Sequence, residues 1–132
     1  MPRILGTDDA VNACDCCGKV NLKFTVVVEL DDGEVVHYGQ VCAGRNTGKD
    51  RRTQTSEAKA YHLEQVNAAR REFLAGDAYR AERARFAERD AARVLPGLKA
   101  AEFVREAADA ADTAARAIAA KYRGVSFWDV RG

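Results

Sequence analysis

Four cysteines lie in the first third of this 132-residue chain, and their spacing suits a metal ion. Cys14 and Cys17 form a C-x-x-C pair followed directly by Gly18, which lets two thiolates grip one ion from a tight turn. Cys42 comes later in the chain and would close the site as a third ligand. The sequence therefore predicts a Zn²⁺ site with Cys14, Cys17 and Cys42 as ligands and Cys16 as a candidate fourth.

The identity of the fourth ligand stays open at this stage. Cys16 is available, but neighbouring residues rarely both bind one ion without strain, and Cys17 is its neighbour. His37 precedes the third cysteine on the expected return strand, and His62 lies in the next helix. A water molecule would leave the open position that catalytic zinc sites keep. Without a metal, the cysteines would be reduced thiols or a disulfide, and the expected cytoplasmic location disfavours the disulfide.

Strand and turn signals follow the first cysteines and would carry the third one to them. Residues 22–30 are rich in strand formers, residues 31–33 read Asp-Asp-Gly, and residues 34–38 form a second apolar run. An Asp-Gly pair supplies the positive φ values that tight hairpins need, so we expect a β-hairpin here. Residues 39–48 are expected to leave the hairpin as a short helical turn that ends near Gly48.

The order of knuckle, hairpin and cysteine at a helix start resembles the small treble-clef, or zinc-ribbon-like, modules of bacterial and bacteriophage proteins. The resemblance covers residues 11–48. It implies a metal-stabilised fold, and such modules serve many roles. The pattern usually finishes with Cys or His three residues after the third cysteine, where this chain has Arg45. A head of this size buries little core, and a structural zinc ion contributes roughly 10–16 kcal/mol of apparent binding free energy.

A basic segment over residues 45–55 is expected to form a loop beyond the head. Its Gly44–Lys49 stretch has the wrong glycine spacing for a phosphate-binding P-loop, and Asp50 stands where Ser or Thr should bind magnesium. The remaining cations are candidate phosphate contacts, although short charge runs are usually just solvated. The candidate nucleic-acid-binding residues are Arg45, Lys49, Arg51 and Arg52.

The rest of the chain predicts long helices, because alanine, glutamate, arginine and leucine dominate it. Ser56 is the expected N-cap of the first helix, which breaks or bends at Gly76 and stops near residues 95–97. A final helix over residues 98–123 carries an alanine-rich heptad seam, to be covered within the chain or by a second copy. We therefore expect an α+β fold, with a metal-binding head and basic linker over residues 1–52. A helical hairpin or three-helix bundle would occupy residues 53–132.

Charge and composition exclude several classes of protein. The net charge of +1 excludes a bulk polycation, and 47% hydrophobic residues exclude wholesale disorder. No apolar run approaches the length of a membrane span, so no membrane partner is expected. Residues 1–44 hold three basic and seven acidic residues, so the head itself should not contact nucleic acid. No constellation of catalytic residues stands out, and we expect a protein that is not an enzyme.

The sequence thus predicts a zinc-stabilised module that binds a protein or nucleic-acid partner in the cytoplasm. It would be an accessory or regulatory protein of phage or bacterial type. One alternative is a sequence-tolerant nucleic-acid binder that uses the basic linker and the arginines of the middle helices. Another is a helical scaffold protein that forms a homodimer through the alanine seam.

Overall fold

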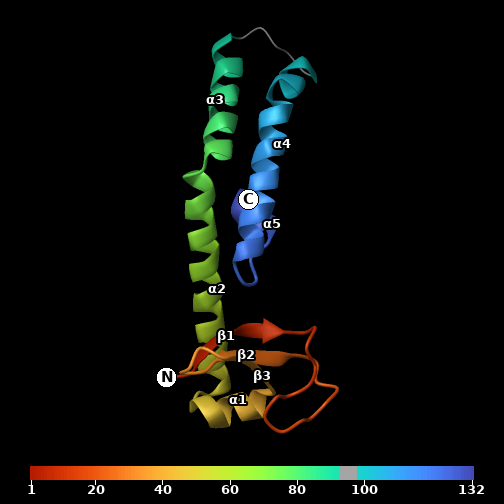
Figure 1. Ribbon diagram of the computed structural model, residues 1–132, viewed down its shortest axis with the longest axis vertical. Helices are drawn as coiled ribbons and strands as arrows, with labels where there is room; N and C mark the ends of the chain where they lie inside the picture. The colour runs from red at the N-terminus through yellow and green to blue at the C-terminus, as the bar shows by residue number, and fades with distance from the viewer. Residues whose placement is uncertain (93–97) are drawn as a thin grey trace. The chain divides into compact units, whose positions relative to one another are not determined.

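The computed structural model of the chain describes residues 1–92 and 98–132. It divides into two compact units, Met1–Glu64 (unit 1) and Gln65–Gly132 (unit 2), and each is described by itself. The elements run from three strands to five helices, which confirms the α+β class (Figure 1). The head boundary expected after residue 52 lies inside unit 1, and the units divide within a helix.

Unit 1 is built on an antiparallel sheet of β1 (Arg3–Asp8), β2 (Thr25–Glu29) and β3 (Val35–Tyr38), in that order. The predicted hairpin is present as β2 and β3. Its turn is closed by hydrogen bonds from Leu30 N to Glu34 O (2.8 Å) and from Gly33 N to Leu30 O (2.9 Å). Gly33 has a φ of +86°, which is the positive value that the Asp-Gly pair predicted for this turn.

The strand β1 was not predicted. It pairs with β2 through an irregular register, which shifts between Ile4 and Gly6. Because β1 occupies the free edge of β2, the hairpin strand becomes the centre of the sheet. Val26, Val27 and Val28 are all buried, so β2 is covered on both faces.

Helix α1 (Gln40–Thr47) and the first part of α2 (Arg51–Leu74) complete the core of unit 1 (Figure 1). Small side chains on both helices let them approach the sheet closely. Ala43 of α1 is fully buried, and Ala58 of α2 packs against the same cluster. The buried cluster consists of Ile4, Val26, Val28, Val36 and Ala43. Helix α1 ends as predicted at Gly48, which adopts the left-handed conformation and donates to Gly44 O.

The prediction of a basic loop over residues 45–55 was wrong. Most of it is helical, and only residues 48–50 connect α1 to α2. The expected N-cap Ser56 lies inside α2, because Asp50 caps the helix six residues earlier. The Asp50 carboxylate accepts from Thr53 N (2.8 Å), and its carbonyl accepts from Gln54 N (2.9 Å). Hydrogen bonding to the backbone and side chain of Thr53 lowers the pKa of Asp50.

Unit 2 contains the end of α2, α3 (Asp77–Ala92), α4 (Leu98–Lys121) and α5 (Phe127–Arg131). Of the two alternatives at Gly76, the structure shows the break. The alanine seam of α4 packs inside this unit: Ala111 and Ala115 are fully buried against Phe73 and Val130. The predicted stop at residues 95–97 lies outside the described residues.

The short helix α5 docks on the same core. Ser126 and Asp129 form a reciprocal capping box at its start. Phe127 packs against the core, whereas the neighbouring Trp128 is 75% exposed. No helix in the described ranges has the length and apolarity that crossing a membrane requires.

Candidate metal centre

The sulfurs of Cys14, Cys17 and Cys42 lie within 4.8 Å of one another. Cys14 is 3% exposed, Cys42 is buried, and Cys17 faces solvent. All four cysteines of the chain are free thiols. The structure therefore brings together the three cysteines that the spacing singled out, from two segments of unit 1. They could hold a metal ion.

The knuckle that presents Cys14 and Cys17 is closed by its own backbone. Cys14 N donates to Lys19 O and Gly18 N donates to Cys14 O, each at 2.9 Å. Gly18 has a φ of +75°, so the glycine after the C-x-x-C pair is required by the turn. Asp15 ties the knuckle to β3 twice: Asp15 N donates to His37 O (2.7 Å), and the Asp15 carboxylate accepts from His37 N (2.8 Å).

Cys42 sits in the first turn of α1, where the helix dipole favours a thiolate. Gly39 immediately precedes this helix and passes close to the knuckle. A Cβ atom at Gly39 would lie 3.8 Å from the Cys14 sulfur. The close approach of the chain at Gly39 is what sets the first turn of α1 against the C-x-x-C pair.

The thiols influence one another strongly. Burial raises the pKa of Cys14, but hydrogen bonds from the backbone of Cys17, Gly39 and Cys16 outweigh it and lower the pKa to about 7. Side-chain hydrogen bonding with Cys17 and Cys14 raises the pKa of Cys42 to about 12. Three thiolates at this spacing repel one another, so a bound cation is what would let all three ionise.

Cys16 lies at the edge of the cluster. Its side chain adds to the hydrogen bonding that raises the pKa of Cys42. Its sulfur also accepts a hydrogen bond from Asn46 Nδ2 at 3.6 Å, and the same nitrogen donates to Cys42 O at 2.7 Å. Asn46 follows Cys42 by one helical turn. It is the residue after Arg45, the position at which treble-clef modules usually carry the fourth ligand. Sequence reasoning gave Asn46 no role.

The two histidines lie outside the cluster within the described part of the chain. His37 Nε2 lies 3.4 Å from the Asp8 carboxylate on β1. His62 is exposed on α2. Cys16 also lies outside the group of three sulfurs, but of the fourth ligands considered from the sequence it is the one whose side chain interacts with that group.

Three thiolate donors are a soft ligand set, which suits Zn²⁺, Cu⁺ or an iron–sulfur cluster better than Mg²⁺ or Ca²⁺. The knuckle supplies backbone N–H groups toward the Cys14 sulfur, the arrangement that supports a metal-bound thiolate. The residues present thus fit a thiophilic metal ion.

The four basic candidates lie on α1, on α2 and in the connection between them. Arg45, Arg51 and Arg52 are exposed. Lys49 is less able to bind a phosphate, because its charge is already paired. Its Nζ lies 2.7 Å from the Glu57 carboxylate and donates to Pro2 O at 2.8 Å. Lys49 therefore anchors the N-terminus of the chain to α2.

Comparison with protein-family models, curated proteins and solved structures found no match for this chain.

Proposed function

We propose that Cys14, Cys17 and Cys42 hold a structural Zn²⁺ ion, and that the chain is a non-enzymatic module that binds a protein or nucleic-acid partner. The observation that carries the proposal is the approach of the three sulfurs to within 4.8 Å. Two of them come from the knuckle and the third from α1. A metal ion at this point would fasten the knuckle to the helix.

The surroundings of the sulfurs favour a structural ion over a catalytic one. Cys14 and Cys42 are buried, and Cys16 is held beside them by Asn46. With Cys16 as the fourth ligand, the ion would be closed off by four sulfurs and would have no position for substrate, which is the arrangement of structural zinc sites. We propose zinc because it is the usual ion of closed thiolate knuckles on a C-x-x-C turn.

The energetics of unit 1 support the same role. The knuckle contributes a single buried residue, Cys14, between the end of β1 and the start of β2. The backbone hydrogen bonds that Cys14 and Asp15 make to Lys19 and His37 are too few to order the 16 residues between β1 and β2, since each ordered residue costs about 1–2 kcal/mol of conformational entropy. Metal binding would supply the missing stability.

Native mass spectrometry of the freshly purified chain, with and without a chelator, tests the proposal. We expect one zinc ion per chain, and we expect the chelator to remove it and lower the melting temperature. A chain that carries no stoichiometric zinc, and whose melting curve the chelator leaves unchanged, would contradict the structural role. The same spectra report the number of chains, and thereby test the possible homodimer.

A further inference from the structure

We propose that unit 1 binds the phosphates of a polynucleotide on a basic face formed by Arg45, Arg51, Arg52 and Lys59. This face lies on α1 and the first turns of α2. The inference rests on the proposed function in one respect, because the metal ion would fix α1, which carries Arg45. It goes further in naming the partner and the residues that contact it.

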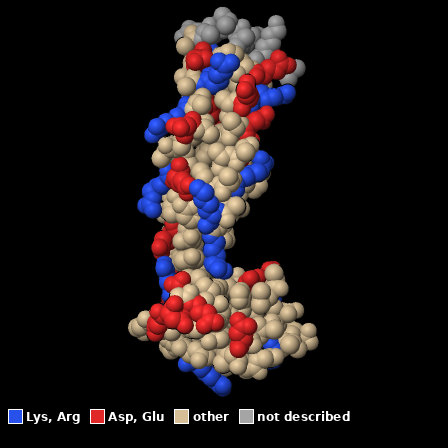
Figure 2. All heavy atoms as spheres, in the orientation of Figure 1, with Lys and Arg blue, Asp and Glu red and all other residues tan. Residues whose placement is uncertain are grey.

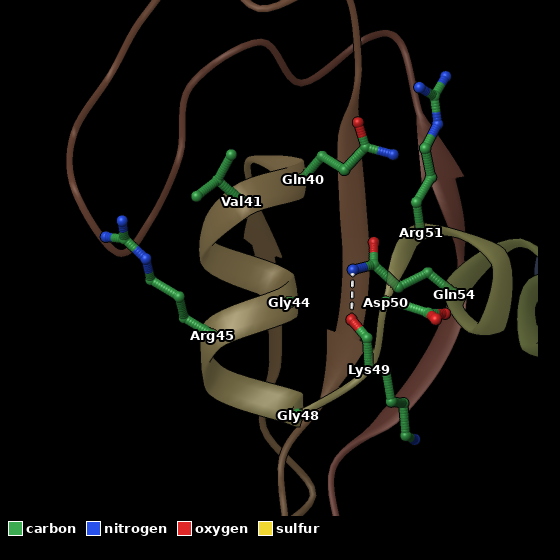
Figure 3. Close-up of a pocket in the computed structure, with 9 residues that line it drawn as sticks. All are labelled: Gln40, Val41, Gly44, Arg45, Gly48, Lys49, Asp50, Arg51 and Gln54. Carbon is green, nitrogen blue, oxygen red and sulfur yellow. Dashed lines mark hydrogen bonds between the residues drawn. The ribbon is translucent and has the colours of Figure 1, made fainter.

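The first support is a pocket of about 490 Å³ where α1 meets the start of α2 (Figure 3). Arg45 and Arg51 line it on two sides, and both side chains extend outward from it in Figure 3. Gly44 forms part of its wall, and a Cβ atom there would lie 3.3 Å from Lys49 O. The connection between α1 and α2 therefore passes so close to Gly44 that a side chain there would have little room.

A second pocket of about 510 Å³ continues the first along α2 and shares Arg51 with it. It is lined by Arg52, Lys59 and the hydroxyl residues Thr55 and Ser56. Arginine, lysine and hydroxyl side chains are the groups that proteins commonly place on phosphate oxygens. Two adjoining pockets joined by one arginine suit a ligand whose negative charges repeat along a chain.

The positive charges of these four residues are not paired with acidic side chains in the described part of unit 1. Within residues 1–92 and 98–132, none of them forms an ion pair or a cation–π contact. Lys49, by contrast, is neutralised by Glu57. Among the described residues, Asp50 is the only acidic one that lines either pocket, and its carboxylate accepts from Thr53 N. Figure 2 shows acidic side chains gathered on another part of unit 1.

The beginning of α2 adds to the attraction. The helix dipole favours an anion here, next to the Asp50 carboxylate that already accepts from Thr53 N. An independent observation also points to a ligand: Gln54 is 5% exposed, and its Oε1 has no hydrogen-bond partner among the residues that the structure describes. Its Nε2 donates to Lys49 O at 2.9 Å, and Figure 3 shows the Oε1 turned the other way, toward the Gln40 side of the pocket.

A nucleotide matches both features of this face. Its phosphates accept from arginine, and its amino or hydroxyl groups can donate to the Gln54 oxygen after a small movement of the pocket wall. Three of the four cations are arginines, whose planar guanidinium groups bind phosphate through two parallel hydrogen bonds. We therefore favour a polynucleotide over an acidic peptide.

Fluorescence anisotropy with labelled single-stranded and duplex oligonucleotides tests the proposal on the full chain as purified. We expect binding that weakens steeply with salt. The variant Arg45→Gln/Arg51→Gln/Arg52→Gln should bind at least about tenfold more weakly, with a salt slope reduced by about 2–3. The matched control Arg80→Gln/Arg83→Gln/Arg123→Gln removes three exposed arginines of unit 2 and should change affinity far less.

Several results would overturn the proposal. These are no binding of any oligonucleotide at low salt, affinity that does not depend on salt, and an equal loss in the two triple variants. Tighter binding of labelled polyglutamate than of an oligonucleotide of equal charge would assign the face to an acidic protein instead. The zinc content of each sample is measured in parallel. Metal-free protein that still binds DNA contradicts the proposed function alone, and zinc-loaded protein that binds none contradicts this inference alone.

Discussion

Asn46 Nδ2 lies 3.6 Å from the Cys16 sulfur and 2.7 Å from the Cys42 carbonyl oxygen. One side-chain amide thus joins the middle of the knuckle to the helix that carries the third cysteine. The arrangement holds the Cys16 sulfur near the three clustered sulfurs. From the sequence alone, Cys16 was a doubtful ligand, because adjacent residues such as Cys16 and Cys17 rarely both bind one ion.

We predict that Cys16 is the fourth metal ligand. In the Co²⁺-substituted chain, the thiolate-to-cobalt charge-transfer absorption of Cys16→Ser should fall by about a quarter, because one of four thiolates is lost. The variant should still bind one ion. An absorption equal to that of the unchanged chain would show that Cys16 does not bind the metal and that water or another group completes the site.

Removal of the metal should loosen unit 1 selectively. We expect Cys14→Ser to abolish stoichiometric zinc binding, and backbone amides of β2 and β3 to exchange faster with deuterium in the variant. The helix α4 belongs to unit 2, and its core of Ala111, Ala115 and Phe73 does not involve the cysteines. Its amides should keep their protection, which hydrogen exchange measured by mass spectrometry reports in the same experiment. Equal loss in α4 would contradict the independence of the two units.

The sequence was informative where one local signal decided the structure. The Asp-Gly turn predicted the hairpin, the C-x-x-C-Gly motif predicted the knuckle, and Gly48 predicted the end of α1. Each depends on a few neighbouring residues and on a φ value that glycine adopts at low cost.

Features that depend on distant residues were missed. β1 has no strong strand signal of its own and is ordered by pairing with β2. Three buried valines in a row on β2 are typical of a strand covered on both faces, and they could have indicated a further strand. Ser56 and Asp50 are both plausible caps, and contacts of α2 with the sheet, such as that of Glu57 with Ile4 N, favour the earlier start. The contact between Asn46 and Cys16 requires the folded site.

The carboxylate of Glu57 should stabilise unit 1 in a pH-dependent way. It is paired with Lys49 and accepts from Ile4 N at 3.0 Å. Burial raises its pKa, but the Lys49 hydrogen bond, the Ile4 N–H and the charges of Lys49 and Arg3 outweigh burial and lower the pKa below 4.5. A carboxyl whose pKa is lower in the folded chain stabilises it above the unfolded value, and that contribution is lost as the pH falls through the folded pKa.

We therefore expect Glu57→Gln to lower the free energy of unfolding by about 2 kcal/mol at pH 7, as for the loss of a charged hydrogen bond. The difference from the unchanged chain should shrink as the pH falls below 4.5. Urea unfolding at a series of pH values measures it. Glu64→Gln is the matched control, because Glu64 pairs with Arg3 in a largely exposed position and should matter less. A difference that stays constant down to pH 3 would contradict the assigned cause.

A second ion pair should hold α5 in place in unit 2. Arg131 donates from Nη1 and Nη2 to the two oxygens of Glu82, at 2.8 and 2.6 Å, and from Nε to Asp112 at 2.9 Å. Glu82 is only 4% exposed, so its charge depends on this partner. Loss of the guanidinium would leave a buried carboxylate unpaired, which is costly.

We predict that Arg131→Met lowers the free energy of unfolding by about 3 kcal/mol. Adding Glu82→Leu to this variant should recover part of the loss, because the unpaired carboxylate is then gone. Arg83→Met is the control, since Arg83 is exposed on α3 and forms no ion pair within residues 1–92 and 98–132, so its loss should change the free energy of unfolding by about 0.5 kcal/mol or less. Urea unfolding followed by circular dichroism gives the free energies, and the fluorescence of Trp128, the single tryptophan, reports whether α5 detaches first. If the double variant is less stable than Arg131→Met alone, the penalty does not come from the buried charge of Glu82.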